Sequence, residues 1–159
     1  MQGLSSVSNL RTIGESMTKK LETIKASSSA QEAAEKMRDR KVSSLVVIDD
    51  DSTKPVGIII ERNLVRKVCA QHASSKHTKI QDIMSDALVT TDAISEVGVA
   101  ADIMIQNQVR HLLVVKDDDI TKPLGIITPS DFAGYLKENL NMDNINAKII
   151  ESLREIETY

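Results

Sequence analysis

The strongest constraint on the fold is an internal duplication. Residues 13–64 align with residues 80–132 at an offset of 67, which becomes 68 after one residue is inserted in an acidic turn. The matched pairs are spread over the whole stretch and include Met17 with Met84, Leu21 with Leu88, Ala33 with Ala100, Met37 with Met104, and Gly57 with Gly125. Because chance does not keep so many pairs in register, the chain carries two copies of one unit.

Each copy contains an amphipathic helix near its start. The helical face recurs at the same spacing in both copies, as Ala30, Ala33, Ala34 and Met37 and then as Val97, Ala100, Ala101 and Met104. Two overlapping capping boxes fit the start of the first helix, Ser28 with Gln31 and Ser29 with Glu32. The small alanines predict that a sheet or another helix packs closely on this face.

Two short apolar runs follow each helix and predict a β-hairpin. The runs lie at 45–48 and 56–60 in the first copy, and at 112–115 and 124–127 in the second. A second helix follows at about 63–70 and 130–136, and a short strand precedes each copy's first helix at 21–23 and 88–90. The predicted fold class is α/β (α+β), with two tandem β-α-β-β-α repeats packed by pseudo-twofold symmetry so that each covers the other's apolar face.

Charge, apolar runs and cysteine content exclude several classes of function. The net charge of −3 argues against nonspecific nucleic-acid binding, and no apolar run reaches the roughly 18 residues needed to span a bilayer. The N-terminal residues lack a secretory signal, and the single cysteine, Cys69, excludes an internal disulfide framework. We expect a cytoplasmic protein in which Cys69 is buried on a helix.

One motif in the second copy carries candidate binding chemistry. After its last strand, Thr128 suits a helix N-cap, Pro129 the first helical position and Asp131 the acidic third position. These residues are sufficient for a well-capped helix without any ligand. They also suit a nucleotide, because a helix N-terminus attracts phosphate and a carboxylate accepts hydrogen bonds from a ribose diol. The residues alone leave both interpretations open.

The motif Gly125-Ile126-Ile127-Thr128-x-x-Asp131, placed after the strand that follows Arg110 and His111, resembles the signature of the CBS (cystathionine β-synthase-type) domain family. The resemblance covers nearly all of residues 13–138. It implies a tandem module with two clefts, in which family members commonly bind AMP, ADP, ATP or S-adenosylmethionine. It also implies that such modules pair, so we expect a homodimer.

The resemblance assigns roles to particular residues. The cleft is expected to centre on Thr128, Ser130 and Asp131, with Asp131 on the ribose. Arg110, His111 and, from the first copy, Arg62 are expected near the phosphate. The remaining candidates are Ser43 and Ser44 along the cleft, and Glu22, Thr23 and Ile24 beside the base.

The first copy departs from the motif, since Ile60 and Asn63 replace the threonine and the aspartate. A lost charge-assisted hydrogen bond is worth about 1.5–3 kcal/mol, so nucleotide affinity there is expected to fall about tenfold or more. The sequence thus predicts one strong and one weak or empty nucleotide site per chain.

Metal ligands and catalytic constellations are not expected. The three histidines lack metal-ligand spacing, and the acidic runs at 49–51 and 117–119 are typical of solvated turns. We expect an N-terminal segment at 1–12, repeats at 13–70 and 80–138, a solvated linker at 71–79 and a C-terminal helical extension at 139–159. That extension either covers the module's own surface or forms an oligomer contact.

The expected function is a non-catalytic regulatory module that binds an adenine nucleotide, AMP or ADP first and ATP second, and signals to an unidentified regulated protein. No cofactor is expected. The alternatives are an oligomerisation or scaffold protein with a vestigial ligand site, and a binder of S-adenosylmethionine.

Overall fold

The computed structural model describes residues 11–139 and places two three-stranded sheets at the centre of the molecule. The first sheet contains β1 (Thr23–Lys25), β2 (Ser44–Ile48) and β3 (Pro55–Ile60), and the second contains β4 (Thr90–Asp92), β5 (Leu112–Lys116) and β6 (Asp119–Ile127). In each sheet the central strand pairs in parallel with the first strand and antiparallel with the third. The two copies therefore fold alike, and the predicted mixed α/β fold class is confirmed.

Helices flank the sheets in the order that the duplication predicts. They are α1 (Ile13–Ser16), α2 (Ala30–Arg40), α3 (Glu61–Leu64), α4 (Ile80–Ile83), α5 (Val97–Asn107) and α6 (Pro129–Asn139), and a π-helical turn, η1 (Val65–Cys69), extends α3. At the start of α2, the Ser29 hydroxyl accepts a hydrogen bond from the amide of Glu32, whose carboxylate accepts one from the amide of Ser29. The capping box is therefore Ser29 with Glu32.

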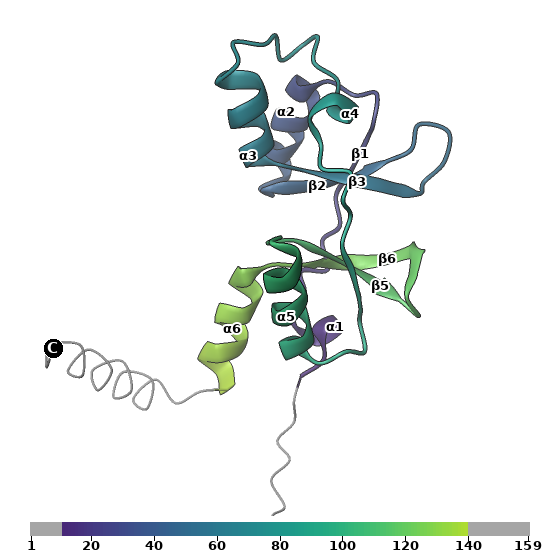
Figure 1. Ribbon diagram of the computed structural model, residues 1–159, viewed down its shortest axis with the longest axis vertical. Helices are drawn as coiled ribbons and strands as arrows, with labels where there is room; N and C mark the ends of the chain where they lie inside the picture. Colours follow the sequence, from purple (N-terminus) through teal and green to yellow (C-terminus); the bar gives the residue numbers. More distant parts are fainter. Residues whose placement is uncertain (1–10, 140–159) are drawn as a thin grey trace, which may run out of the picture.

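Alternating side chains on the strands bury both faces of each sheet. Leu45 and Val47 point to the helices of the first copy, whereas Val46 between them packs against Leu113 and Val115 of the other sheet. All five of these side chains are buried. The sheets thus face each other across the middle of the molecule, with helices on their outer faces (Figure 1).

The leading helix of each copy packs with the other copy. Ile13 of α1 is fully buried in the core formed by α5, α6 and the second sheet, while Ile80 and Ile83 of α4 lie in the core of the first sheet. Figure 1 shows α1 among the helices of the second sheet and α4 among those of the first. We call the first sheet with α2, α3, η1 and α4 the first unit, and the second sheet with α1, α5 and α6 the second unit.

One crossing segment in each copy, at 17–22 and at 84–89, connects the leading helix to its own copy's sheet and runs against the other copy's sheet. Thr18 forms an isolated bridge with Ile126, and Ser85 forms one with Ile58. A Cβ atom built on Gly57 would lie 2.6 Å from the Ser85 carbonyl oxygen, and one built on Gly125 would collide with the Thr18 carbonyl. The glycine of each strand motif therefore makes room for the crossing segment.

Some expected details differ from the structure. The first strand of each copy begins at Thr23 and Thr90, two residues later than predicted, because the preceding residues belong to the crossing segments. Cys69 is exposed, so its predicted burial is wrong; Val68, one residue earlier, takes the buried position on η1.

The connector at 71–79 is mostly exposed, as expected, but its backbone is held to the start of α2. The amide of Ala30 donates to the Thr78 carbonyl, and the amide of Gln31 donates to that of Ser75. The expected C-terminal helical extension lies outside the described residues, apart from its first position at the end of α6. From residue 11 to residue 139, no helix is long and apolar enough to cross a bilayer.

Candidate functional site

A cleft of about 490 Å³ lies where the two units meet. Its walls come from both copies: the start of α3 with Ile58 and Ser43, the crossing segment at 85–89, the loop at 108–111 and the start of α6 at 128–130. A volume of this size is typical of small-molecule sites. Because residues of both copies line the cleft, a ligand that fills it contacts both copies.

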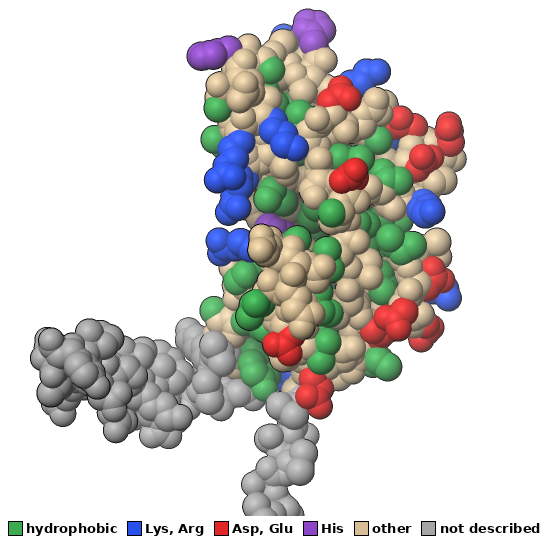
Figure 2. Space-filling model, in the orientation of Figure 1, with side chains coloured by type: hydrophobic (Ala, Val, Ile, Leu, Met, Phe, Trp, Pro, Cys, Tyr) green, Lys and Arg blue, Asp and Glu red, His purple; other side chains and the backbone are tan. Residues whose placement is uncertain are grey.

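Three cationic or potentially cationic side chains line the cleft. Arg62 comes from the start of α3, and Arg110 and His111 come from the loop before β5. Within the described residues, none of the three forms a side-chain hydrogen bond or an ion pair with a protein carboxylate. Figure 2 shows lysine and arginine side chains gathered along one edge of the molecule on both sides of the level where the units meet, whereas acidic side chains gather mainly toward the opposite edge.

His111 is half-buried at this position, and its surroundings disfavour the imidazolium form. Burial lowers the pKa of His111 below its ordinary value of 6.5, and the positive charges of Arg110 and Arg62 lower it further. We call Arg62, Arg110 and His111 the cationic end of the cleft. The exposed carboxylate of Glu61 also lines the cleft but forms no ion pair with these three side chains within the described residues, so a phosphate could still pair with them.

Apart from Glu61, the rest of the lining offers hydroxyl groups and an apolar wall. Ser43, Thr128 and Ser130 contribute hydroxyls, and Ala87–Val89 form an uncharged stretch of the wall. Asn63 also lines the cleft, and its side-chain oxygen accepts a hydrogen bond of 3.0 Å from the Ile60 amide. Asn63 therefore caps α3 in the way that Asp131 caps α6, despite the loss of charge.

Asp131 is not part of the cleft lining. One carboxylate oxygen accepts hydrogen bonds from the Thr128 amide (2.7 Å) and hydroxyl (3.2 Å). The other accepts from the Thr18 hydroxyl at 3.1 Å, across the bridge between the two copies. Asp131 thus caps the start of α6 through the Thr128 amide, and both of its carboxylate oxygens accept hydrogen bonds from protein donors.

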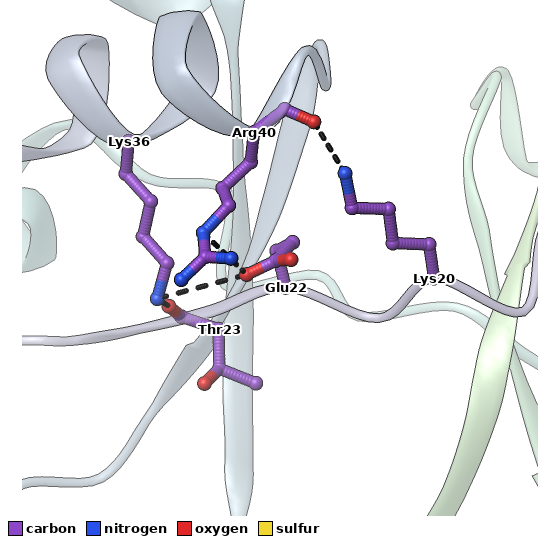
Figure 3. A network of polar contacts seen from close by, with 5 residues as sticks. All are labelled: Lys20, Glu22, Thr23, Lys36 and Arg40. Carbon is purple, nitrogen blue, oxygen red and sulfur yellow. Dashed lines mark hydrogen bonds and ion pairs between the residues drawn. The ribbon is translucent and has the colours of Figure 1, made fainter.

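The first strand of the first copy is held in a separate polar network (Figure 3). The Glu22 carboxylate lies 4.0 Å from the Lys36 ammonium and 3.9 Å from Arg40 Nε. Lys36 also donates to the Thr23 carbonyl at 2.5 Å, and Lys20 donates to the carbonyl of Arg40. These contacts tie the crossing segment and β1 to α2.

The structure therefore divides the residues that the sequence singled out. Those that line the cleft together are Ser43, Arg62, Arg110, His111, Thr128 and Ser130. Those outside its lining are Glu22, Thr23, Ile24, Ser44 and Asp131, with Ile24 buried in the core of the first unit.

Sequence reasoning missed the wall at 85–89. A signal for it was present, because the offset of 67 maps the segment before β1 onto the segment before β4. Applied to 18–22, it gives 85–89, with Val89 in the place of Glu22 and Ala87 in the place of Lys20. Two charged residues of the first copy, Lys20 and Glu22, are thus replaced by apolar residues that line the cleft, whereas Lys19 corresponds to Asp86, which is outside the lining.

Two stretches of the sequence, residues 10–70 and 80–138, each match the family model of the CBS domain. The chain belongs to the CBS domain family. Its two copies are tandem CBS domains, and the cleft lies between them. Within the described residues, no group of three or more His, Cys, Asp or Glu side chains is placed to hold a metal ion.

Relatives of these CBS domains occur in archaea. An uncharacterised protein from Methanopyrus kandleri is 34% identical over 120 residues, which cover 76% of this chain and 60% of that protein. The crystal structure of an uncharacterised conserved protein from Pyrococcus horikoshii has a TM-score of 0.73 and 30% identity, covering 85% of this chain and 98% of that one. A CBS domain protein from Pyrobaculum aerophilum, complexed with AMP, shares the fold with a TM-score of 0.66 and 23% identity, covering 76% of this chain and 88% of that one.

Proposed function

We propose that this pair of CBS domains is a non-catalytic regulatory module that binds an adenine nucleotide, AMP or ADP first, in the cleft between its two copies. The observation that carries the proposal is the cationic end: Arg62, Arg110 and His111 converge in a cleft of about 490 Å³ and have no acidic protein partner within the described residues. The related fold from Pyrobaculum aerophilum holds AMP, which supports the same ligand class here.

The chemistry of the lining suits the parts of such a nucleotide. A phosphate at the cationic end would accept charge-assisted hydrogen bonds from two guanidinium groups, which bind phosphate in a planar fork. The uncharged wall at 87–89 suits a flat base, and the hydroxyls of Thr128 and Ser130 suit the polar groups between base and phosphate. The proposed site is lined by the starts of both motifs, but it includes Asn63 of the first copy and not Asp131 of the second, on which the expected site was centred.

Binding in this cleft provides a route to regulation. Arg62 belongs to the first unit, while Arg110 and His111 belong to the second. A nucleotide that contacts all three would stabilise the arrangement of units in which they converge, and it shifts an equilibrium only by its differential affinity for the two arrangements. We propose that an unidentified partner protein senses this arrangement.

Thermal unfolding and calorimetric titration with AMP, ADP, ATP and S-adenosylmethionine test the proposal. We expect phosphate-bearing nucleotides to raise the unfolding temperature. The Arg62→Ala variant should bind AMP about tenfold more weakly or worse, because one charge-assisted interaction with phosphate is lost. Arg66→Ala is the matched control, since Arg66 is exposed on η1 and lies outside the cleft lining.

Three results would contradict the proposal. If none of the phosphate-bearing nucleotides binds at millimolar concentration, the module is better explained as a scaffold with a vestigial site. If S-adenosylmethionine alone binds, the ligand class is wrong. If Arg62→Ala and Arg66→Ala bind AMP equally, the nucleotide does not occupy this cleft.

A further inference from the structure

The charged groups around His111 are few and can all be named. Arg110 precedes it in the same loop, and Glu61 and Arg62 face the cleft from the start of α3. The other walls, at 85–89, at 108–109, at 128–130 and at Ser43, contribute no further charged side chain to the lining, because Asp86 of the stretch at 85–89 is outside it. Two fixed positive charges and one carboxylate therefore set the electrostatic surroundings of the imidazole.

These surroundings keep His111 neutral in the ligand-free cleft. Its pKa is lowered first by burial and then by the two guanidinium groups, while Glu61 is exposed and does not offset them. At neutral pH the imidazole is consequently a weak partner for an anion, because only one of its nitrogens carries a hydrogen to donate.

A phosphate dianion at the cationic end reverses this balance. Opposite charge close to a titratable group favours its charged form, and an imidazolium donates from both nitrogens. We propose that the cleft takes up one proton on His111 together with its phosphate-bearing ligand, so that nucleotide binding reports pH as well as nucleotide concentration. This inference rests on the proposed function and adds a second input to the same site.

Two specific properties of the ligand follow from this coupling. It must carry a dianionic phosphate, because a neutral nucleoside or a positively charged sulfonium would not favour the imidazolium. Its affinity must fall as pH rises across the neutral range, by at most about tenfold per pH unit for a single proton taken up.

Calorimetric titration with AMP at pH 7, repeated in buffers with different ionisation enthalpies, measures the protons taken up on binding. A phosphate monoester has its second pKa near 6 and is already mostly a dianion at this pH, so the ligand itself contributes little. We expect uptake of about half to one proton per AMP in the natural protein. His111→Gln should lower this value toward zero, and His72→Gln, exposed and outside the cleft lining, should leave it unchanged.

A second measurement follows the imidazole NMR signals of the natural protein, so it does not depend on whether a variant folds. The His111 titration midpoint should move upward when AMP is added and stay in place with adenosine, while the signals of His72 and His77 should not respond to AMP. AMP binding without proton uptake or a shifted midpoint overturns the coupling and leaves the proposed function standing. The absence of any AMP binding overturns both.

Discussion

At the scale of single residues, His111 couples the stability of the ligand-free protein to pH. Its pKa in the folded state is lowered below 6.5, mainly by burial, so below that pH the unfolded chain binds more protons at this position than the folded chain does. The His111 contribution to the free energy of unfolding therefore falls as pH drops through about 6.5, the ordinary pKa of histidine.

We expect His111→Gln to weaken this pH dependence. Without the titrating imidazole, less stability should be lost between about pH 7.5 and 5.5 than in the natural protein. Urea unfolding followed by circular dichroism at several pH values measures the difference. His72→Gln is the control, because His72 is exposed, and parallel pH curves for all three proteins would show that His111 does not titrate as inferred.

Residue types alone left two local alternatives open, and the contacts in the fold bear on both. Ser28 with Gln31 and Ser29 with Glu32 have the same spacing, and the choice depends on where α2 begins, at Ala30. For Asp131, the residues of a capping box and those of a ribose site are the same. The sequence therefore could not reveal that the hydroxyl of Thr18, 113 positions away, donates a hydrogen bond to one carboxylate oxygen of Asp131.

At the scale of the elements, the close passage of each crossing segment over a strand explains the glycines of the repeated motif. A methyl group on Gly57 would meet the Ser85 carbonyl oxygen at 2.6 Å and the Met84 sulfur at 2.8 Å. The hydrogen bonds between Ile58 and Ser85, both 2.9 Å, hold the two backbones together and leave little freedom to relax.

Gly57→Ala should therefore destabilise the protein by about 1–3 kcal/mol, the usual range for forced overpacking. Gly98→Ala is the matched control, because nothing lies within 4 Å of its added Cβ and Gly98 sits in α5. There the same change should be neutral or stabilising by up to about 1 kcal/mol. Chemical denaturation measures both, and equal effects of the two substitutions would contradict the close-packing explanation.

The strands with strong local signals were predictable, whereas the short first strands were not. The β-branched runs fixed β2, β3 and β5 to within a residue or two, because two buried faces demand continuous apolar residues. β1 and β4 have three residues each and were placed two positions early. Their boundaries depend on the crossing segments, which pair with the opposite sheet through bridges at Thr18 and Ser85 that local patterns do not encode.

At the scale of the whole molecule, the two units complete each other's cores. Ile13 is fully buried against the second sheet and its helices, although it belongs to the first copy in sequence. The layer of Val46, Ile58, Leu113, Val115 and Ile126 between the sheets joins the units further. We therefore expect the tandem to unfold as one cooperative system.

Ile13→Ala should lower the free energy of unfolding by about 2–5 kcal/mol, as is usual for truncating a buried aliphatic side chain. Urea unfolding followed by circular dichroism should show this loss of stability as a single transition. Ile94→Ala is the control, because Ile94 is 82% exposed and its removal should change stability by less than about 0.5 kcal/mol. Two separated transitions in the Ile13 variant would contradict joint unfolding.

The duplication predicted two like units facing each other, but not which copy's leading helix each unit contains. An offset between repeats is the same whether a segment packs within its own copy or with the other one. The residues alone did not show that Arg62 and His111 meet, because they come together only through the contact between units; the family resemblance supplied that expectation.

The exchange of leading helices has a consequence for a chain that carried one copy alone. Such a chain would leave the core position of Ile13 or Ile80 empty and would have its own leading helix unplaced. Two identical chains trading that helix would satisfy both, and this is the geometry of a domain-swapped homodimer. The tandem chain can accordingly be described as a swapped dimer whose two subunits are joined covalently by the connector at 71–79.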